Sequence, residues 1–164
     1  MKRILTLIIS ILLLIFPVTL YSCFSGGEKV KRETLTELNY RGLKFYETVG
    51  GHTIRRHVGK NYKWLVERLE SEPRLRSASS FYDLRTAEEV VRRAISENRN
   101  RIKEWLLNSR APNKLVLIYR GEKPIGIKVV RGRGYYTERV CKSARIVLKK
   151  DKRFGFIVLT AYPT

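Results

Sequence analysis

The chain has 164 residues, which is room for one domain of ordinary size and one short additional segment. Its 34 Lys and Arg against 15 Asp and Glu give a formal net charge of +19, more than solubility requires, and this excess indicates a polyanionic partner or surface. Two cysteines, Cys23 and Cys141, exclude a small fold held by several disulfides, and the sequence shows no cluster of metal-ligating residues.

The first segment has the layout of an export signal. Two basic residues follow the initiator Met, and residues 4–16 are apolar on every side, unlike the one-sided pattern of a surface helix. Residues 20–23, Leu-Tyr-Ser-Cys, resemble the lipobox of bacterial lipoprotein precursors, although Tyr21 is bulkier than the residue usually found there. We therefore predict a signal peptide over residues 1–22, with Cys23 lipidated and the protein anchored to a membrane or cell surface. An ordinary signal with secretion, or an uncleaved anchor, is the alternative.

The remainder of the chain divides near residue 50. Residues 23–49 are polar and mixed, with a flexible Ser25-Gly26-Gly27 stretch and a weak helical spacing in Leu35, Leu38 and Leu43. We predict a tether and an accessory helix here, and one domain over residues 50–164.

Three helical stretches are predicted at the start of that domain. The first covers residues 52–58 and would end at Gly59. Asn61 would cap a second helix through about residue 70, with Trp64, Leu65 and Leu69 on its apolar stripe. The Thr-Ala-Glu-Glu sequence at 86–89 is typical of a capping box and would open a third, long helix that extends past residue 105.

Beyond Pro112 the apolar pattern becomes that of strands. Residues 115–119 form a continuous apolar run, and residues 125–129 alternate. Residues 140–148 and 154–162 complete a set of four predicted strands joined by glycine-rich or charged turns. Helices followed by antiparallel strands indicate the α+β class.

The two histidines, His52 and His57, lie in a strongly basic stretch. An imidazole among cations suits a group that meets a phosphate and exchanges a proton near neutral pH. Because five helical positions turn the side chain by about 140°, both cannot point the same way. We expect one histidine to be catalytic and the other to support it, although an isolated histidine more often has a structural role.

The C-terminal strand carries two hydroxyl side chains. Residues two positions apart on a strand share a face, so Thr160 and Tyr162 are predicted to lie together, on the face that also carries Phe156 and Val158. Threonine and tyrosine also favour strands for their own sake, so this pattern alone leaves a structural role equally open.

Several separated segments, in the same order, resemble the ribonuclease A-like toxin domain at the tips of bacterial contact-dependent growth inhibition proteins. The matching segments are Gly-Gly-His-Thr-Ile-Arg-Arg-His-Val-Gly-Lys at 50–60, Ala-Ser-Ser-Phe at 78–81 with Thr-Ala-Glu at 86–88, residues 98–105, and Leu-Thr-Ala-Tyr-Pro-Thr at 159–164. The resemblance implies a ribonuclease A-like fold without disulfides that cleaves RNA without metal. Such domains usually end a very large exported protein, whereas this one follows its own predicted signal.

The resemblance also implies an active site made from a histidine, an arginine, a threonine and a tyrosine. The last two fall on Thr160 and Tyr162, and the arginine on Arg68. From its spacing to that arginine the histidine falls on His57, with His52 as the competing choice. Lys60 and Lys63 are expected to attract RNA phosphates.

The expected activity is that of a metal-independent endoribonuclease that works by transesterification of the RNA 2′-hydroxyl, in a secreted or surface-tethered toxin. His57 would act as base or acid, Tyr162 would supply or position the second proton, and Arg68 would stabilise the phosphorane. Thr160 would position a phosphate or a base. We expect no cofactor, a monomer, RNA as substrate and a cognate immunity protein as partner. The alternative is a non-enzymatic basic lipoprotein that binds nucleic acid or anionic envelope polymers.

Overall fold

The computed structural model describes residues 38–164. The predicted signal peptide, Cys23 and the tether lie outside the described residues. In chain order the helices and strands are α2 (Leu43–Thr48), α3 (Thr53–His57), α4 (Tyr62–Ser71), β1 (Ser77–Phe81), α5 (Leu84–Glu97), α6 (Arg99–Leu107), β2 (Lys114–Arg120), β3 (Gly126–Arg131), β4 (Tyr136–Cys141), β5 (Ser143–Asp151) and β6 (Gly155–Pro163).

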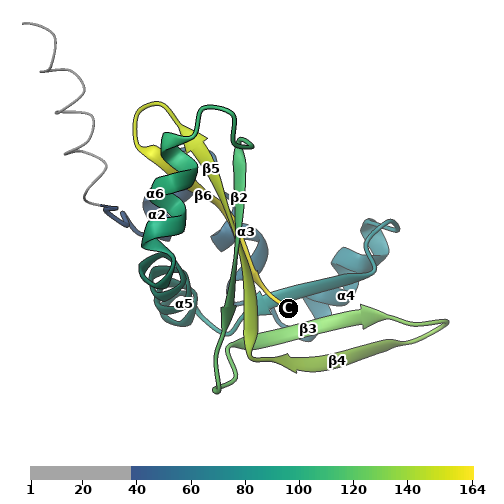
Figure 1. Cartoon of the computed structure of the whole chain (residues 1–164). Helices are drawn as coiled ribbons and strands as arrows, with labels where there is room; N and C mark the ends of the chain where they lie inside the picture. Colours follow the sequence, from purple (N-terminus) through teal and green to yellow (C-terminus); the bar gives the residue numbers. More distant parts are fainter. Residues whose placement is uncertain (1–37) are drawn as a thin grey trace, which may run out of the picture. The chain divides into compact units, whose positions relative to one another are not determined.

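The strands form two antiparallel sheets of three strands each, with the orders β1-β3-β4 and β2-β5-β6. Figure 1 shows the strands of one sheet running across the direction of the other, with α5 beside β2 and α4 near β3. The predicted α+β class is confirmed, because the chain combines helices with two antiparallel sheets. Within residues 38–164 the cysteine at position 141 is buried and unpaired.

The strand prediction was wrong in two places. The segment 77–81 is strand β1, which the sequence did not predict because four of its five residues are buried and show no alternation. The predicted strand 140–148 is two strands that belong to different sheets. At the junction Cys141 O accepts from Ile125 N at 2.8 Å and Lys142 O accepts from Gly121 N at 3.0 Å. The backbone thus passes from pairing with β3 to pairing with β2.

The helix ends follow from side-chain caps. Asn61 caps α4 as predicted, because its Oδ1 accepts from Trp64 N at 2.9 Å. The predicted capping box at 86–89 was wrong: Asp83 caps α5, and its Oδ1 accepts from Thr86 N at 2.7 Å. The long third helix is divided at Asn98, whose side-chain Nδ2 donates to Ala94 O at 2.9 Å and so competes with the helical backbone.

Two apolar clusters hold these elements together. The larger one lies between α2, α5, α6 and the β2-β5-β6 sheet, with Tyr46, Val91 and Leu148 among its buried side chains. The smaller one packs α4 on β1 and β3 through Leu65, Leu69, Ala78 and Val129. No helix within residues 38–164 is long and apolar enough to cross a membrane. The two clusters leave α3 at the place where both sheets meet, since this helix contacts β6 and β1.

Candidate active site

Helix α3 closes the outer edge of β6, the last strand of its sheet. His52 N donates to Leu159 O at 3.0 Å, and Ala161 N donates to Thr53 Oγ1 at 2.9 Å. The backbone before α3 lies so close to β6 that position 51 requires glycine, because a Cβ there would lie 2.6 Å from Val158 O. These contacts satisfy edge groups that a strand would otherwise leave unpaired, and they fix α3 against the end of β6.

His57, the last residue of α3, is buried and oriented by two contacts. The residue is 9% exposed, and its Nδ1 lies 3.0 Å from Ser79 O. A carbonyl oxygen only accepts, so Nδ1 carries the proton and Nε2 is left as the acceptor. The imidazole also packs on the Tyr162 ring, with centroids 5.2 Å apart and planes inclined by 32°. The structure therefore joins two of the predicted site residues from opposite ends of the domain.

The surroundings of His57 favour its neutral form. Burial lowers its pKa to about 4, and the positive charges of Arg68 and Arg56 act in the same direction, as does His52, while the hydrogen bond to Ser79 opposes them. Near neutral pH the ring is therefore uncharged. It can accept a proton at Nε2, which is the property that a general base needs.

The alternation along β6 is interrupted by a bulge, which corrects the predicted faces. Val158 pairs with Leu148 but Thr160 pairs with Val147, so one residue of β6, Leu159, is extra. Thr160 and Tyr162 still share a face, but it is opposite to the one that holds Val158. The bulge turns both hydroxyl-bearing residues away from the core face.

Two buried side-chain polar atoms within residues 38–164 have no hydrogen-bond partner, and both belong to predicted site residues. They are Arg68 Nη1 and Thr160 Oγ1. The Arg68 side chain is 12% exposed, and its Nε lies 3.1 Å from Glu72 Oε1. Buried groups without partners are rare because they raise the free energy of the folded state. Here they are a donor and a hydroxyl that an anionic ligand could engage.

The remaining predicted site residues lie further along the same surface. His52 is only half-buried and stands at the N-cap of α3. Burial and the charges of Arg56 and Arg55 lower its pKa, and Glu47 opposes them. Lys60 and Lys63 line a groove at the start of α4. The geometry packs His57 on Tyr162; His52 is the less buried of the two histidines, and its electrostatic interactions with His57 and Arg68 place it near the same site.

Sequence reasoning missed three residues that shape the site. Ser79 fixes the His57 tautomer through its main-chain oxygen, and Thr53 ties α3 to β6 through its hydroxyl. Trp64, which the sequence assigned to an apolar stripe, also lines the groove beside the two lysines. A main-chain contact leaves no signal in residue type, whereas a buried threonine inside a conspicuous histidine motif could have been noticed.

Comparison with known proteins identifies the family of this chain. Residues 51–163 match the family model described as the bacterial CdiA-CT RNAse A domain. The crystal structure of a CdiA-CT/CdiI complex from Y. kristensenii 33638 contains a similar chain, 39% identical with a TM-score of 0.61, and the match covers 70% of this chain and 99% of that one. A search of curated proteins gives no match. The chain therefore belongs to the bacterial CdiA-CT ribonuclease A family, and its described part is a ribonuclease A-like toxin domain of contact-dependent growth inhibition.

Proposed function

We propose that this toxin domain is a metal-independent endoribonuclease that cleaves RNA by transesterification of the 2′-hydroxyl. The observation that carries the proposal is the packing of neutral His57, with Nε2 left to accept a proton, against the phenol of Tyr162. The unpartnered atoms of Arg68 and Thr160 support it, because each suits a phosphate oxygen.

In the proposed reaction His57 Nε2 takes the proton of the 2′-hydroxyl, and that oxygen attacks the adjacent phosphorus. The bond from phosphorus to the 5′-oxygen breaks, and the departing oxygen receives a proton from the Tyr162 hydroxyl. The products are a 2′,3′-cyclic phosphate and a free 5′-hydroxyl. Arg68 stabilises the charge on the phosphorane, and Thr160 positions a phosphate oxygen or the base. No oxidant, cofactor or protein nucleophile takes part.

The decisive assay incubates the purified protein with RNA and with matched DNA in the presence of a chelator. We expect RNA to be cut to cyclic-phosphate ends and DNA to be left intact, because DNA lacks the attacking oxygen. Loss of activity on chelation, or equal cutting of both, would refute the scheme. His57→Ala should bind RNA normally but cut it at a rate lower by about 10²–10⁴. A wild-type protein that binds RNA without cutting it would instead support the non-enzymatic alternative.

The related crystal structure is a CdiA-CT/CdiI complex, and we propose that this chain also binds a cognate immunity protein. The strong positive charge makes an acidic partner the expectation. The product of a neighbouring reading frame, added in equimolar amount, should block RNA cleavage. An acidic neighbour that neither binds nor inhibits would contradict this.

Anchoring of the toxin through Cys23 is proposed from the lipobox-like sequence at residues 20–23. Labelling of cells with a fatty-acid analogue tests it. We expect label on the wild-type chain and none on Cys23→Ala. No label on the wild type, or undiminished label on Cys23→Ala, would refute lipidation of Cys23 and leave secretion or an uncleaved anchor.

A further inference from the structure

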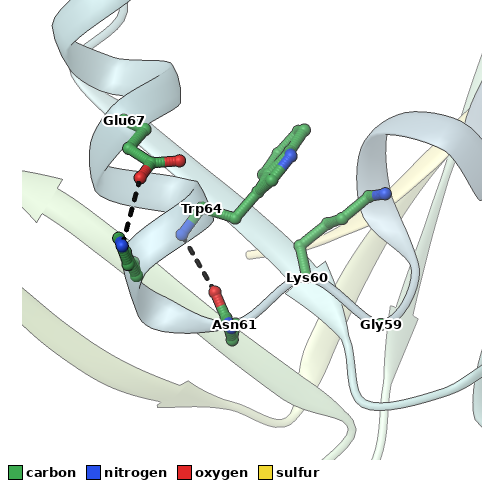
Figure 2. A pocket seen from close by; sticks show the side chains of 6 residues that line it. Gly59, Lys60, Asn61, Trp64 and Glu67 are labelled. Carbon is green, nitrogen blue, oxygen red and sulfur yellow. Dashed lines mark hydrogen bonds and ion pairs between the residues drawn. The ribbon is translucent and has the colours of Figure 1, made fainter.

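A groove lies between the loop that follows α3 and the first turns of α4. It measures about 380 Å³ and is lined by Gly59, Lys60, Asn61, Lys63, Trp64 and Glu67. In Figure 2 the indole of Trp64 and the side chain of Lys60 project side by side into this space, and Glu67 lies one turn further along the helix. A volume of this size is within the range of small-ligand sites, roughly 300–1,000 Å³.

The Trp64 indole connects the groove with Arg68. Lys60 Nζ lies 4.9 Å and Arg68 Cζ 5.9 Å from the centroid of the Trp64 ring. The indole also packs against the smaller apolar cluster, which holds it in place, while its half-buried side chain still lines the groove. An aromatic side chain with two cations beside it is the combination on which a base of a single strand stacks, and the base would take the place of the Lys60 ammonium over the ring.

Strand β1 positions the groove and His57 through adjacent residues. Ser80 Oγ accepts from Lys60 N at 2.9 Å, and the neighbouring Ser79 O accepts from His57 Nδ1 at 3.0 Å. Gly59 N donates to Phe81 O at 3.0 Å, which holds the loop on the same strand. The groove is therefore linked to the candidate active site by two sets of contacts, one through β1 and one through Trp64 and Arg68.

Charge within the groove is not uniform. Lys60 and Lys63 bring positive charge, whereas Glu67 pairs with Lys63 at 3.9 Å, with both side chains exposed. An exposed pair of this kind is weak, so Lys63 can exchange its partner for a phosphate. The carboxylate repels phosphate from its own end and favours the Lys60 side.

We propose that this groove binds a nucleotide that flanks the scissile phosphate, with its base stacked on Trp64 and its phosphate held by Lys60 and Lys63. This inference rests on the proposed ribonuclease function, which it extends from the reacting phosphate to the neighbouring nucleotide. Recognition is by stacking and charge, so it tolerates different bases and any single strand.

Tryptophan fluorescence can read this subsite without cleavage. The protein has two tryptophans, and Trp105 is 6% exposed with its Nε1 donating to Pro112 O at 2.7 Å. A hexadeoxyadenylate probe cannot be cut, because it lacks the 2′-hydroxyl. Added to the full-length protein, it should quench fluorescence saturably, and Trp64→Phe should remove the quenching because Trp105 is shielded. Absence of quenching in the wild type would overturn the proposal.

Affinity variants separate stacking from charge. By anisotropy of a labelled probe, Trp64→Leu should weaken binding roughly tenfold or more, and its thermal unfolding curve checks that the fold survives. The double variant Lys60→Gln with Lys63→Gln leaves the apolar clusters intact and should weaken binding. The slope of log affinity against log salt concentration should become shallower by roughly 0.7 for each phosphate that the variant no longer neutralises. The matched control, Lys123→Gln with Lys152→Gln, removes the same charge from exposed turns and should change binding little. Equal decreases in affinity for the two double variants would overturn the proposal.

Three further outcomes distinguish the subsite from the reaction and from simple charge attraction. If the protein binds the probe with quenching of Trp64 but does not cut RNA, the subsite is supported and the proposed ribonuclease function is refuted. If the protein cuts RNA but its Trp64 and Lys60 variants bind the probe as tightly as the wild type, the ribonuclease function is supported and the subsite is refuted. Inorganic polyphosphate has charge but no base, so it should bind more weakly than the probe at equal charge; equal binding would refute stacking.

Discussion

At the scale of single residues, the burial of His57 determines the pH range in which the proposed base can work. Its pKa is lowered to about 4, chiefly by burial and further by Arg68, so the ring is neutral above about pH 5 and becomes protonated as the pH falls through 4. We expect kcat/KM for a short RNA to be constant from neutral pH down to about 5 and to fall below that. Initial rates across this range provide the measurement. An acid limb near the ordinary histidine value of about 6.5 would assign the base to a more exposed group than His57.

The same shift makes folding stability depend on pH. Between about pH 6.5 and 4 the unfolded chain binds a proton at His57 that the folded protein does not, so stability falls as the pH is lowered through this window. The decrease is at most about 3 kcal/mol. Urea unfolding at several pH values should show it for the wild type and show a smaller decrease for His57→Gln. If stability depends on pH in His57→Gln as it does in the wild type, other titrating groups are responsible for the decrease.

Thr160 and Thr53 offer a matched pair of hydroxyl deletions. Thr160 Oγ1 is buried without a partner, whereas Thr53 Oγ1 accepts from Ala161 N. We expect Thr160→Val to keep or raise stability while lowering the cleavage rate by about 10-fold or more, because it removes an unsatisfied group that the substrate would engage. Thr53→Val should lower stability by about 1–3 kcal/mol, since it leaves a buried N–H without an acceptor. Denaturation and single-turnover rates on both variants test the contrast, and a Thr160→Val that is destabilised but fully active would contradict it.

The sequence could predict which residue types form the site better than it could predict which of them are in contact. Two hydroxyls at a strand end and histidines among cations are visible in sequence, because spacing and composition carry them. The packing of His57 on Tyr162 joins residues far apart in the chain, and the hydrogen bond to Ser79 uses a main-chain oxygen. Neither leaves a local pattern. The assignment of catalytic roles stays a prediction, which the cleavage assays test.

At the scale of elements, the sequence predicted helices correctly where caps and apolar periodicity agree. It was wrong where the pairing of one strand with another determines the structure. Asn61 begins α4 as expected. Strand β1 is buried along most of its length, so it shows no alternation to detect. The bulge in β6 depends on its register with β5, which no single strand reveals. It nevertheless decides which way Thr160 points.

The cap of α4 supports a prediction at this scale. Asn61 Oδ1 accepts the N–H of Trp64 itself, so Asn61→Ala should destabilise the protein by about 1 kcal/mol and loosen the turn that carries the indole. We expect weaker binding of the uncleavable oligonucleotide as well. Asp83→Ala removes the equivalent cap of α5 and should cost about as much stability without changing that affinity. Chemical denaturation and anisotropy on both variants provide the comparison, and equal decreases in affinity would show that the α4 turn has no special part in binding.

At the scale of the whole molecule, α+β class and a core without disulfides followed from composition and element order, but the number of sheets did not. The four predicted strands became six strands in two sheets, because β1 was not predicted and because the chain changes partner between Cys141 and Ser143. That change of partner depends on tertiary contacts rather than on residue pattern. It also creates the junction where α3 meets β1 and β6, and therefore the candidate site.

The net charge of +19 and the buried site should respond differently to salt. Exposed lysines and arginines attract RNA phosphates through screened, long-range forces, whereas His57 is 9% exposed and the side chain of Arg68 is 12% exposed. Raising salt from about 50 to 200 mM should therefore increase KM steeply, linearly on logarithmic axes, while kcat at saturating RNA changes little. Steady-state kinetics on a fluorogenic RNA give both constants. His57→Ala, assayed for binding alone, should show the same salt slope in Kd, because the slope belongs to the surface charge and not to the base. A kcat that falls in parallel with affinity would place the reacting charges at the solvent-exposed surface, in conflict with the burial of both residues.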